Sequence, residues 1–128
     1  VQNYKTAVRW LRLSAEQGNH DGQLKLGFMY DNGLGVAQDY KTAVKWYKLS
    51  AEQGDADAQM NLGSMYGDGN GIVQDNINAH MWWNISASKG NKDAVKYRDI
   101  IAKRMTPTDI STAQKLAREC VEKKYKGC

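Results

Sequence analysis

Apolar and polar positions along the chain follow a pattern that repeats every 36 residues. The segment Asp39–Gln74 reads DYKTAVKWYKLSAEQGDADAQMNLGSMYGDGNGIVQ, and a shift of 36 positions places it on residues 3–38 without a gap. A more divergent copy begins at Asp75. A fixed period of this length is typical of stacked-repeat proteins. We therefore expect one repeat domain, with repeats over residues 3–38, 39–74 and 75–108 and a half repeat of one helix over 109–128.

Each repeat contains the pattern of two amphipathic helices, here called helix A and helix B. In the second repeat, helix A follows Asp39 and helix B follows Asp55, and aspartate side chains accept hydrogen bonds from the free N–H groups of a helix start. Gly54 lies between the two helices and suits a turn with positive φ. Apolar spacing of i, i+3, i+4 and i+7 predicts one buried face on each helix. These faces are Ala43, Trp46, Tyr47, Ser50 and Ala51 on helix A, and Ala58, Leu62, Met65 and Tyr66 on helix B.

A glycine stands in the middle of helix B in both of the first two repeats, as Gly27 and Gly63. A glycine inside a helix costs about 1 kcal/mol relative to alanine. Because the exception occurs twice at the same position, we expect a neighbouring helix to approach so closely that no Cβ fits. The alternative is a glycine tolerated on the surface.

The third repeat diverges in its helix B, where Asp99 takes the position of Gly27 and Gly63. After Met105, Thr106 and Pro107 form a strong helix start, with threonine as N-cap and proline at the first helical position. The following segment aligns with helix A of the second repeat at a shift of 70 positions, and Gly127 ends it. We therefore expect this last helix to be helix A of a fourth repeat. One face of it carries Ala113, Leu116, Ala117, Cys120 and Val121.

The repeated segments resemble a known family. Residues 3–74 carry the pattern A-x-x-W-Y/L-x-L-S-A-E-Q-G, then Q-x-x-L-G-x-M-Y, then G-x-G-V/I, twice in full. These patterns are similar to the Sel-1-like repeat, a relative of the tetratricopeptide repeat. The resemblance implies an all-α, right-handed α/α superhelical solenoid that serves as a scaffold and holds a protein or peptide on its concave helix-A surface. It fades in helix B of the third repeat, at Val95, Arg98, Asp99, Ile101 and Ala102.

Composition and charge narrow the classes of partner. The 128 residues are 41% hydrophobic and 25% charged, as in ordinary globular domains, and the formal net charge is +4. No apolar run is long enough to span a membrane, so we expect no membrane insertion. The aromatic residues fall on core positions of the repeats, so we expect no nucleic-acid partner. Val1-Gln2 matches Ala37-Gln38 at the end of a loop, which predicts that the chain is a fragment of a longer protein.

Basic residues recur along one side of helix A in the first two repeats. We call them the basic stripe: Lys5, Arg9, Arg12, Lys41, Lys45 and Lys48. In the third repeat this side becomes apolar, and we expect the surface to continue there with Met81, Trp82 and Trp83. A basic groove with aromatic anchors suits an acidic segment of a protein partner. The alternative is a solvated face that keeps the repeats soluble.

No residues at the expected spacings indicate a catalytic or metal site. Neither His20 nor His80 has cysteine or carboxylate residues at ligand spacing, so we expect no metal and no cofactor. Asp55 and Asp57 flank a helix start, where carboxylates stabilise the helix dipole. Because no acid, base and nucleophile converge, we expect that the chain is not an enzyme.

One short motif offers an enzymatic alternative. Ser86-Ala-Ser-Lys89 matches the S-x-x-K pattern of penicillin-interacting serine enzymes, and a weak β-lactam-binding or hydrolysing protein is therefore a second hypothesis. The motif is also simply the third copy of Ser50-Ala-Glu-Gln53, and neither an S-D-N nor a K-T-G motif accompanies it. A third hypothesis is a structural spacer within a longer repeat protein.

The two cysteines, Cys120 and Cys128, lie near the end of the chain. The shift of 70 places them at the positions of Ser50 and Ala58, which face each other in a helical hairpin. In the cysteine-rich branch of the Sel-1-like family, cysteines at this spacing link the helices of one repeat, so the resemblance implies a disulfide. Free packed cysteines are the alternative. A disulfide would indicate a periplasmic or secreted protein, and its absence a cytoplasmic one.

Overall fold

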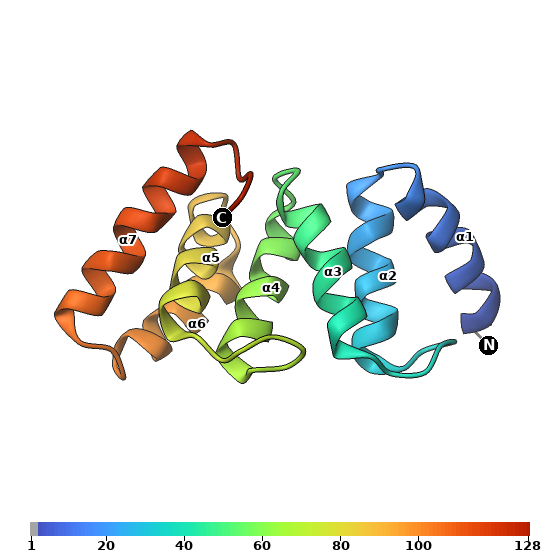
Figure 1. Cartoon of the computed structure of the whole chain (residues 1–128), viewed down its shortest axis with the longest axis horizontal. Helices are drawn as coiled ribbons and strands as arrows, with labels where there is room; N and C mark the ends of the chain where they lie inside the picture. The colour runs from blue at the N-terminus through green and yellow to red at the C-terminus, as the bar shows by residue number, and fades with distance from the viewer. Residues whose placement is uncertain (1–2) are drawn as a thin grey trace.

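The computed structural model describes residues 3–128, and every regular element in that range is an α-helix. Val1 and Gln2, on which the fragment prediction rests, lie outside the described residues. The helices follow one another in a row (Figure 1), which confirms the predicted all-α solenoid. Their bounds are α1 Tyr4–Glu16, α2 His20–Asn32, α3 Tyr40–Ala51, α4 Ala56–Asp68, α5 Asn76–Ser88, α6 Lys92–Ala102 and α7 Pro107–Glu122.

Each helix starts at a side chain that accepts a hydrogen bond from the backbone, as the sequence predicts. The Oδ1 atoms of Asp39 and Asp55 accept from the N–H groups of Thr42 and Ala58 at 3.2 and 3.0 Å. Thr106 caps α7, with Pro107 at its first position. The full set of N-caps is Asn3, Asn19, Asp39, Asp55, Asp75, Asn91 and Thr106. These caps divide the chain into helices at nearly the positions that the repeat predicts.

The first repeats stack by packing each helix B on the next helix A, α2 on α3 and α4 on α5. An aromatic ring from helix A covers the mid-helix glycine of helix B. A Cβ built on Gly27 would lie 2.7 Å from Cδ1 of Tyr47, and one on Gly63 would lie 2.7 Å from Cδ1 of Trp83. The predicted close approach at these glycines is therefore confirmed.

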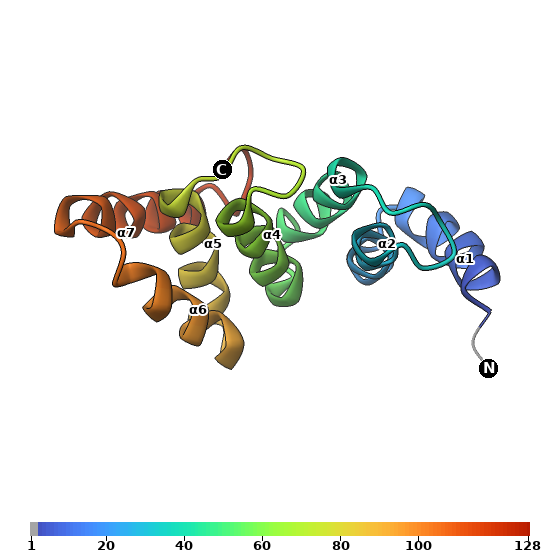
Figure 2. The ribbon, with the colours of Figure 1, turned by 90° about the horizontal axis from the view of Figure 1, so that it is seen from below.

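Helix α7 does not continue this stacking. It packs against α5 and makes few contacts with α6, although α6 is the helix B that precedes it. In Figure 2, α5 lies between α6 and α7. The face of α7 that carries Ala113, Ala117 and Cys120 is buried, while Val121 on the same predicted face is largely exposed. The sequence of α7 aligns with helix A of the second repeat, and in the structure this helix packs on α5 rather than on α6.

The residues at the α6 surface give the reason. Where α2 carries Leu26 and Gly27, α6 carries Arg98 and Asp99, whose side chains pair at 3.1 Å. Arg98 also donates to Oδ1 of Asn84 on α5 at 3.1 Å. The aromatic position is also lost, because Ala117 stands where Tyr47 would align. A charged pair and a small residue cannot rebuild the glycine–aromatic contact. In addition, residues 103–106 link α6 to α7, a shorter connection than 33–39 or 69–75.

The C-terminal tail folds back towards the middle of the row (Figure 1). A disulfide joins Cys120 to Cys128, with their Cα atoms 5.6 Å apart, which confirms the predicted bridge. Tyr125 of the tail lies under the ammonium group of Lys89, which is 4.2 Å from the ring centroid. Lys89 also donates a hydrogen bond to the Gly54 carbonyl. The tail therefore contacts the junction between the second and third repeats.

Candidate protein-binding surface

Half of the basic stripe gathers at one groove on α1. Lys5, Arg9 and Arg12 line a hollow of about 560 Å³, together with Val8, Leu13, Gly35 and Val36. We call this hollow the α1 groove. All three basic side chains are exposed, and Val8 at its floor is buried. The result is an apolar floor with positive charge at its edge.

The lysines of α3, Lys41, Lys45 and Lys48, are also exposed. Lys45 lies over the ring of Trp46, with the ammonium 5.0 Å from the ring centroid. Trp46 in turn packs against the core cluster that contains Val8. On the α1 side, Arg12 donates a hydrogen bond of 2.9 Å to the hydroxyl oxygen of Tyr30. These contacts hold two of the basic side chains over aromatic rings.

Met81, Trp82 and Trp83, the predicted apolar end of the binding surface, are buried. The exposed fractions of Met81, Trp82 and Trp83 are 2%, 1% and 7%. Trp83 is covered by α4, and its indole N–H donates to the Met60 carbonyl at 3.1 Å. Met81 and Trp82 share a core cluster with Ala117 and Cys120 of α7. The prediction of an exposed apolar patch at these three residues is therefore wrong, because α4 and α7 cover it.

Two exposed leucines beside the basic stripe were not identified from the sequence. Leu13 and Leu49 are 49% and 38% exposed, and they occupy the helix-A position at which α5 carries Ile85. Ile85 is 2% exposed because α7 packs on it. Their spacing from Arg9 and Lys45, i to i+4, would have placed them on the same side of the helix. Apolar residues on that side are therefore part of the candidate surface.

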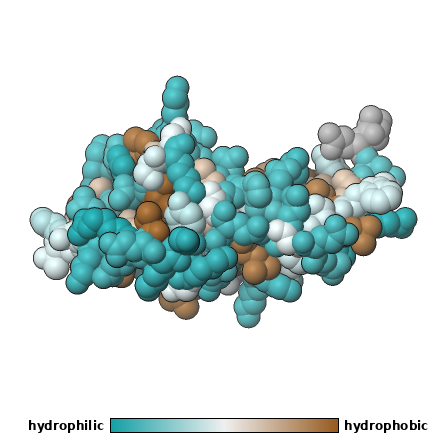
Figure 3. All heavy atoms as spheres, turned by 90° about the horizontal axis from the view of Figure 1, so that it is seen from above, coloured by the Kyte–Doolittle hydropathy of each residue, from teal (hydrophilic) through white to brown (hydrophobic). Residues whose placement is uncertain are grey.

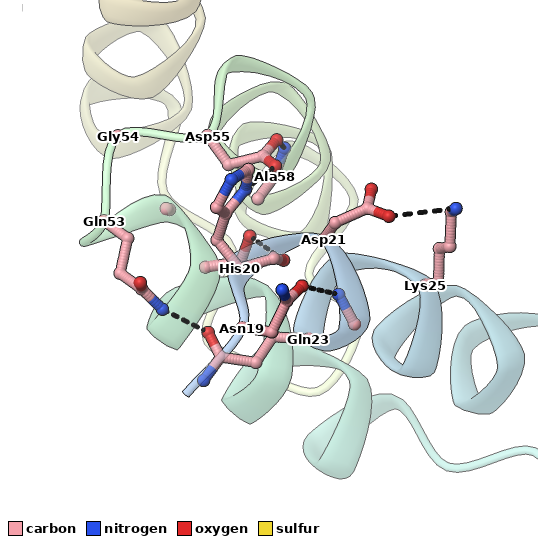
Figure 4. A network of polar contacts seen from close by, with 12 residues as sticks. Asn19, His20, Asp21, Gln23, Lys25, Gln53, Gly54, Asp55 and Ala58 are labelled. Atoms are coloured by element: carbon pink, nitrogen blue, oxygen red, sulfur yellow. Dashed lines mark hydrogen bonds and ion pairs between the residues drawn. The ribbon is translucent and has the colours of Figure 1, made fainter. Parts of the chain in front are cut away.

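The junction between the first and second repeats is held by a polar network (Figure 4). His20 lies at the start of α2, and its Nδ1 is 2.7 Å from Oδ2 of Asp55. The Gln53 amide donates to the carbonyl of Gly18 and to Oε1 of Gln23, at 2.9 and 2.8 Å. His20 and Asp55 thus lie together for a structural purpose. Within residues 3–128 no group of three or more potential ligands could hold a metal ion.

The S-x-x-K motif forms the equivalent contacts at the next junction. Ser86 is fully buried, and its hydroxyl donates to the Ala56 carbonyl at 2.6 Å, as Ser50 donates to the His20 carbonyl at 2.7 Å. Lys89 takes the position of Gln53 and points to the Gly54 carbonyl. Both residues of the motif are therefore used in holding repeats together.

His80 is buried in the core at the position of Val44. In the part of the chain that the structure describes, its Nδ1 has no hydrogen-bond partner. Burial lowers the pKa of His80, the positive charge of Arg98 lowers it further, and Asp99 opposes the change. His80 is thus enclosed by the core, with 3% of its surface exposed.

A second groove, of about 500 Å³, lies on the helix-B side. Its lining is mainly apolar and includes Leu24, Phe28 and Met60 with Asp57 and Lys25 at its edge. Elsewhere, Figure 3 shows one face of the molecule as largely hydrophilic with separate hydrophobic patches. Scattered apolar residues of this kind are normal on protein surfaces.

A family model describes the repeats that form these surfaces. The Sel1 repeat model matches residues 1–19, 20–55 and 56–91, and the chain belongs to this family. Each complete match runs from a helix B to the next helix A, that is, α2–α3 and α4–α5. The matches end before α6, where the sequence also loses the repeat pattern.

Two of the solved structures with similar folds come from bacteria. A protective antigen of uropathogenic Escherichia coli with an SLR fold matches with a TM-score of 0.90 and 30% sequence identity. The match covers 94% of this chain and 27% of the antigen chain. A Sel1 repeat protein from Oxalobacter formigenes matches with a TM-score of 0.71 and 39% sequence identity. This match covers 77% of this chain and 39% of the Oxalobacter chain. This chain thus spans well under half of either protein.

No curated protein matches the chain. Within residues 3–128, no helix is both long and apolar enough to cross a membrane.

Proposed function

We propose that this chain is a protein-interaction module that binds an acidic segment of a protein partner along the side of α1 and α3 that carries the basic stripe. Sel1 repeat proteins are generally scaffolds for protein interactions rather than catalysts. The observation that supports the proposed surface is the α1 groove, where Lys5, Arg9 and Arg12 surround an apolar floor. Positive charge steers an acidic partner to such a groove, and the apolar floor gives it a surface to bury.

The disulfide between Cys120 and Cys128 favours an oxidising compartment as the place of action. Disulfides persist in secreted and periplasmic proteins and are rare in the cytosol. We therefore propose that the partner is also outside the cytosol.

Site-specific photo-crosslinking in the full-length protein tests the proposed surface. A photoreactive residue at Leu13 is compared with one at Ile100 on α6, because the two side chains are similarly exposed, at 49% and 46%. We expect crosslinks from Leu13 to an acidic segment of one protein, identified by mass spectrometry, and loss of these crosslinks in an Arg9→Glu/Arg12→Glu variant. Equal crosslinking from both positions, or none from Leu13, would contradict the proposal.

A further inference from the structure

Helix α7 is bound to the same side of helix A that the proposed function uses in the first two repeats. On α5, the residues that contact or flank α7 are Met81, Asn84 and Ile85. The equivalent residues are Arg9, Arg12 and Leu13 on α1, and Lys45, Lys48 and Leu49 on α3. In the third repeat this side is therefore occupied by a helix of the chain itself.

The buried seam of α7 consists of small residues. Ala113, Ala117 and Cys120 are 0%, 5% and 1% exposed, and two of them share a core cluster with Met81 and Ile85. Small side chains along a seam allow two helices to approach closely, because the distance between helix axes depends on the side chains at the contact. The contact is thus made by large apolar residues of helix A and small residues of the docked helix.

The first two repeats keep the apolar part of this contact surface but not the covering helix. Leu13 and Leu49 are exposed where Ile85 is buried. Basic residues replace Met81 and Asn84 at the neighbouring positions, so a helix docked there would meet positive charge beside the leucines.

We infer that the partner binds as an α-helix, docked on α1 as α7 is docked on α5, with a seam of small residues flanked by glutamate or aspartate. This inference rests on the proposed function and adds the conformation and residue pattern of the bound segment. The small seam covers Leu13, and the acidic flanks pair with Arg9 and Arg12. Burial of apolar side chains supplies the affinity, and the charges select the partner.

Defined peptides test the inference on the chain with its disulfide intact. The probe is a fluorescein-labelled peptide of about 20 residues, about 30 Å long as a helix. It carries alanine at i, i+4 and i+7 and glutamate on both flanks. One control peptide has lysine in place of glutamate. The other is the glutamate peptide with one central residue replaced by proline, which breaks a helix. Binding is measured by fluorescence anisotropy.

We expect the glutamate peptide to bind at least about tenfold more tightly than either control, because one control lacks the complementary charge and the other lacks the helix. Reversing Arg9 and Arg12 to glutamate should weaken binding by about tenfold or more. Reversing the exposed Lys92 and Lys96 of α6, which changes the net charge equally, should leave it within about twofold.

Two results would overturn the inference. The first is equal binding of the glutamate peptide and its proline-containing control, which would indicate an extended segment. The second is an equal effect of both charge reversals, which would indicate attraction without a docking surface. In the first case photo-crosslinking at Leu13 still supports the proposed function, so the two failures are distinguishable.

Discussion

Trp83 lies against the backbone of Gly63 so closely that a Cβ on the glycine would be 2.7 Å from Cδ1 of the ring and 2.8 Å from its Nε1. The same relationship joins Tyr47 to Gly27 one repeat earlier. Because the contact joins helix B of one repeat to helix A of the next, it sets how closely the repeats stack. It is absent where Asp99 replaces the glycine, and there the described stacking ends.

Replacing Gly63 with alanine should therefore destabilise the protein, although alanine favours helices. The gain in helix propensity is about 1 kcal/mol. Forcing a methyl group against the indole should cost more than this gain, for a net loss of about 1–3 kcal/mol in the free energy of unfolding. Urea denaturation measures the difference, with Ser64→Ala on the same helix as the control. Stabilisation by Gly63→Ala would show that the close approach is not rigid.

The disulfide should stabilise the end of the chain, because it restricts the unfolded state. Closing so short a loop contributes about 2–3 kcal/mol by chain-entropy arguments. We expect no free thiol in the unreduced protein after denaturation and two after reduction. Reduction should also lower the melting temperature of the natural chain but not that of a Cys120→Ala/Cys128→Ala variant. Two thiols before reduction would contradict the bridge and, with it, the argument for an oxidising compartment.

His80 should make the protein sensitive to mild acid. Its pKa in the folded state lies below the ordinary value of 6.5, mainly through burial. The unfolded chain therefore binds a proton more readily, and stability is lost as the pH falls below 6.5 towards the lowered pKa.

Replacing His80 with valine, the residue at the equivalent positions 8 and 44, should remove this loss. At pH 7 we expect the free energy of unfolding to stay the same or rise by about 1 kcal/mol, since a buried polar atom without a partner is removed. The reverse change, Val44→His, should introduce acid sensitivity in the second repeat. Urea denaturation at pH 7 and pH 5 compares the variants, and identical pH dependence of His80→Val and the natural chain would contradict the prediction.

Tyr47 should limit stability in alkali. Its hydroxyl donates to Oδ2 of Asp31 at 2.9 Å, and burial, followed by the negative charge of Asp31, raises its pKa above the ordinary value of 10.0. The unfolded chain therefore loses this proton first, and folding stability should fall as the pH rises above 10. We expect Tyr47→Phe to reduce that fall, measured by denaturation at pH 8 and pH 11. The exposed Tyr40→Phe is the control, and an equal effect of both would contradict the prediction.

Ser86→Ala should affect stability and not turnover. The Ser86 hydroxyl is buried and donates a hydrogen bond to the Ala56 carbonyl, so its removal loses this bond between repeats and should cost about 0.5–1.5 kcal/mol. Nitrocefin hydrolysis should be at background in the natural chain and in the variant alike. Turnover that disappears in the variant would revive the β-lactam hypothesis.

Much of the architecture could be predicted from the sequence because its causes are local. Asp39, Asp55 and Thr106 mark helix starts through hydrogen bonds within their own turn. The repeated Gly27 and Gly63 predict close helix packing because a glycine inside a helix has a cost that only a neighbour explains. The position of the disulfide followed from the repeat register together with the resemblance to cysteine-rich relatives.

The candidate surface depended on contacts that the repeat pattern does not contain. The repeat register makes Met81 equivalent to Lys45, and Ile85 equivalent to Leu49. It could not show that α7 covers Met81 and Ile85. That outcome depends on where α7 packs, because burial is decided by the residues brought near rather than by the residue itself. The sequence alone determined the helices and the close packing at Gly27 and Gly63. Only the tertiary structure decided that α7 packs on α5 instead of continuing the row of stacked repeats, so that Ile85 is buried while Leu13 and Leu49 at the equivalent positions stay exposed.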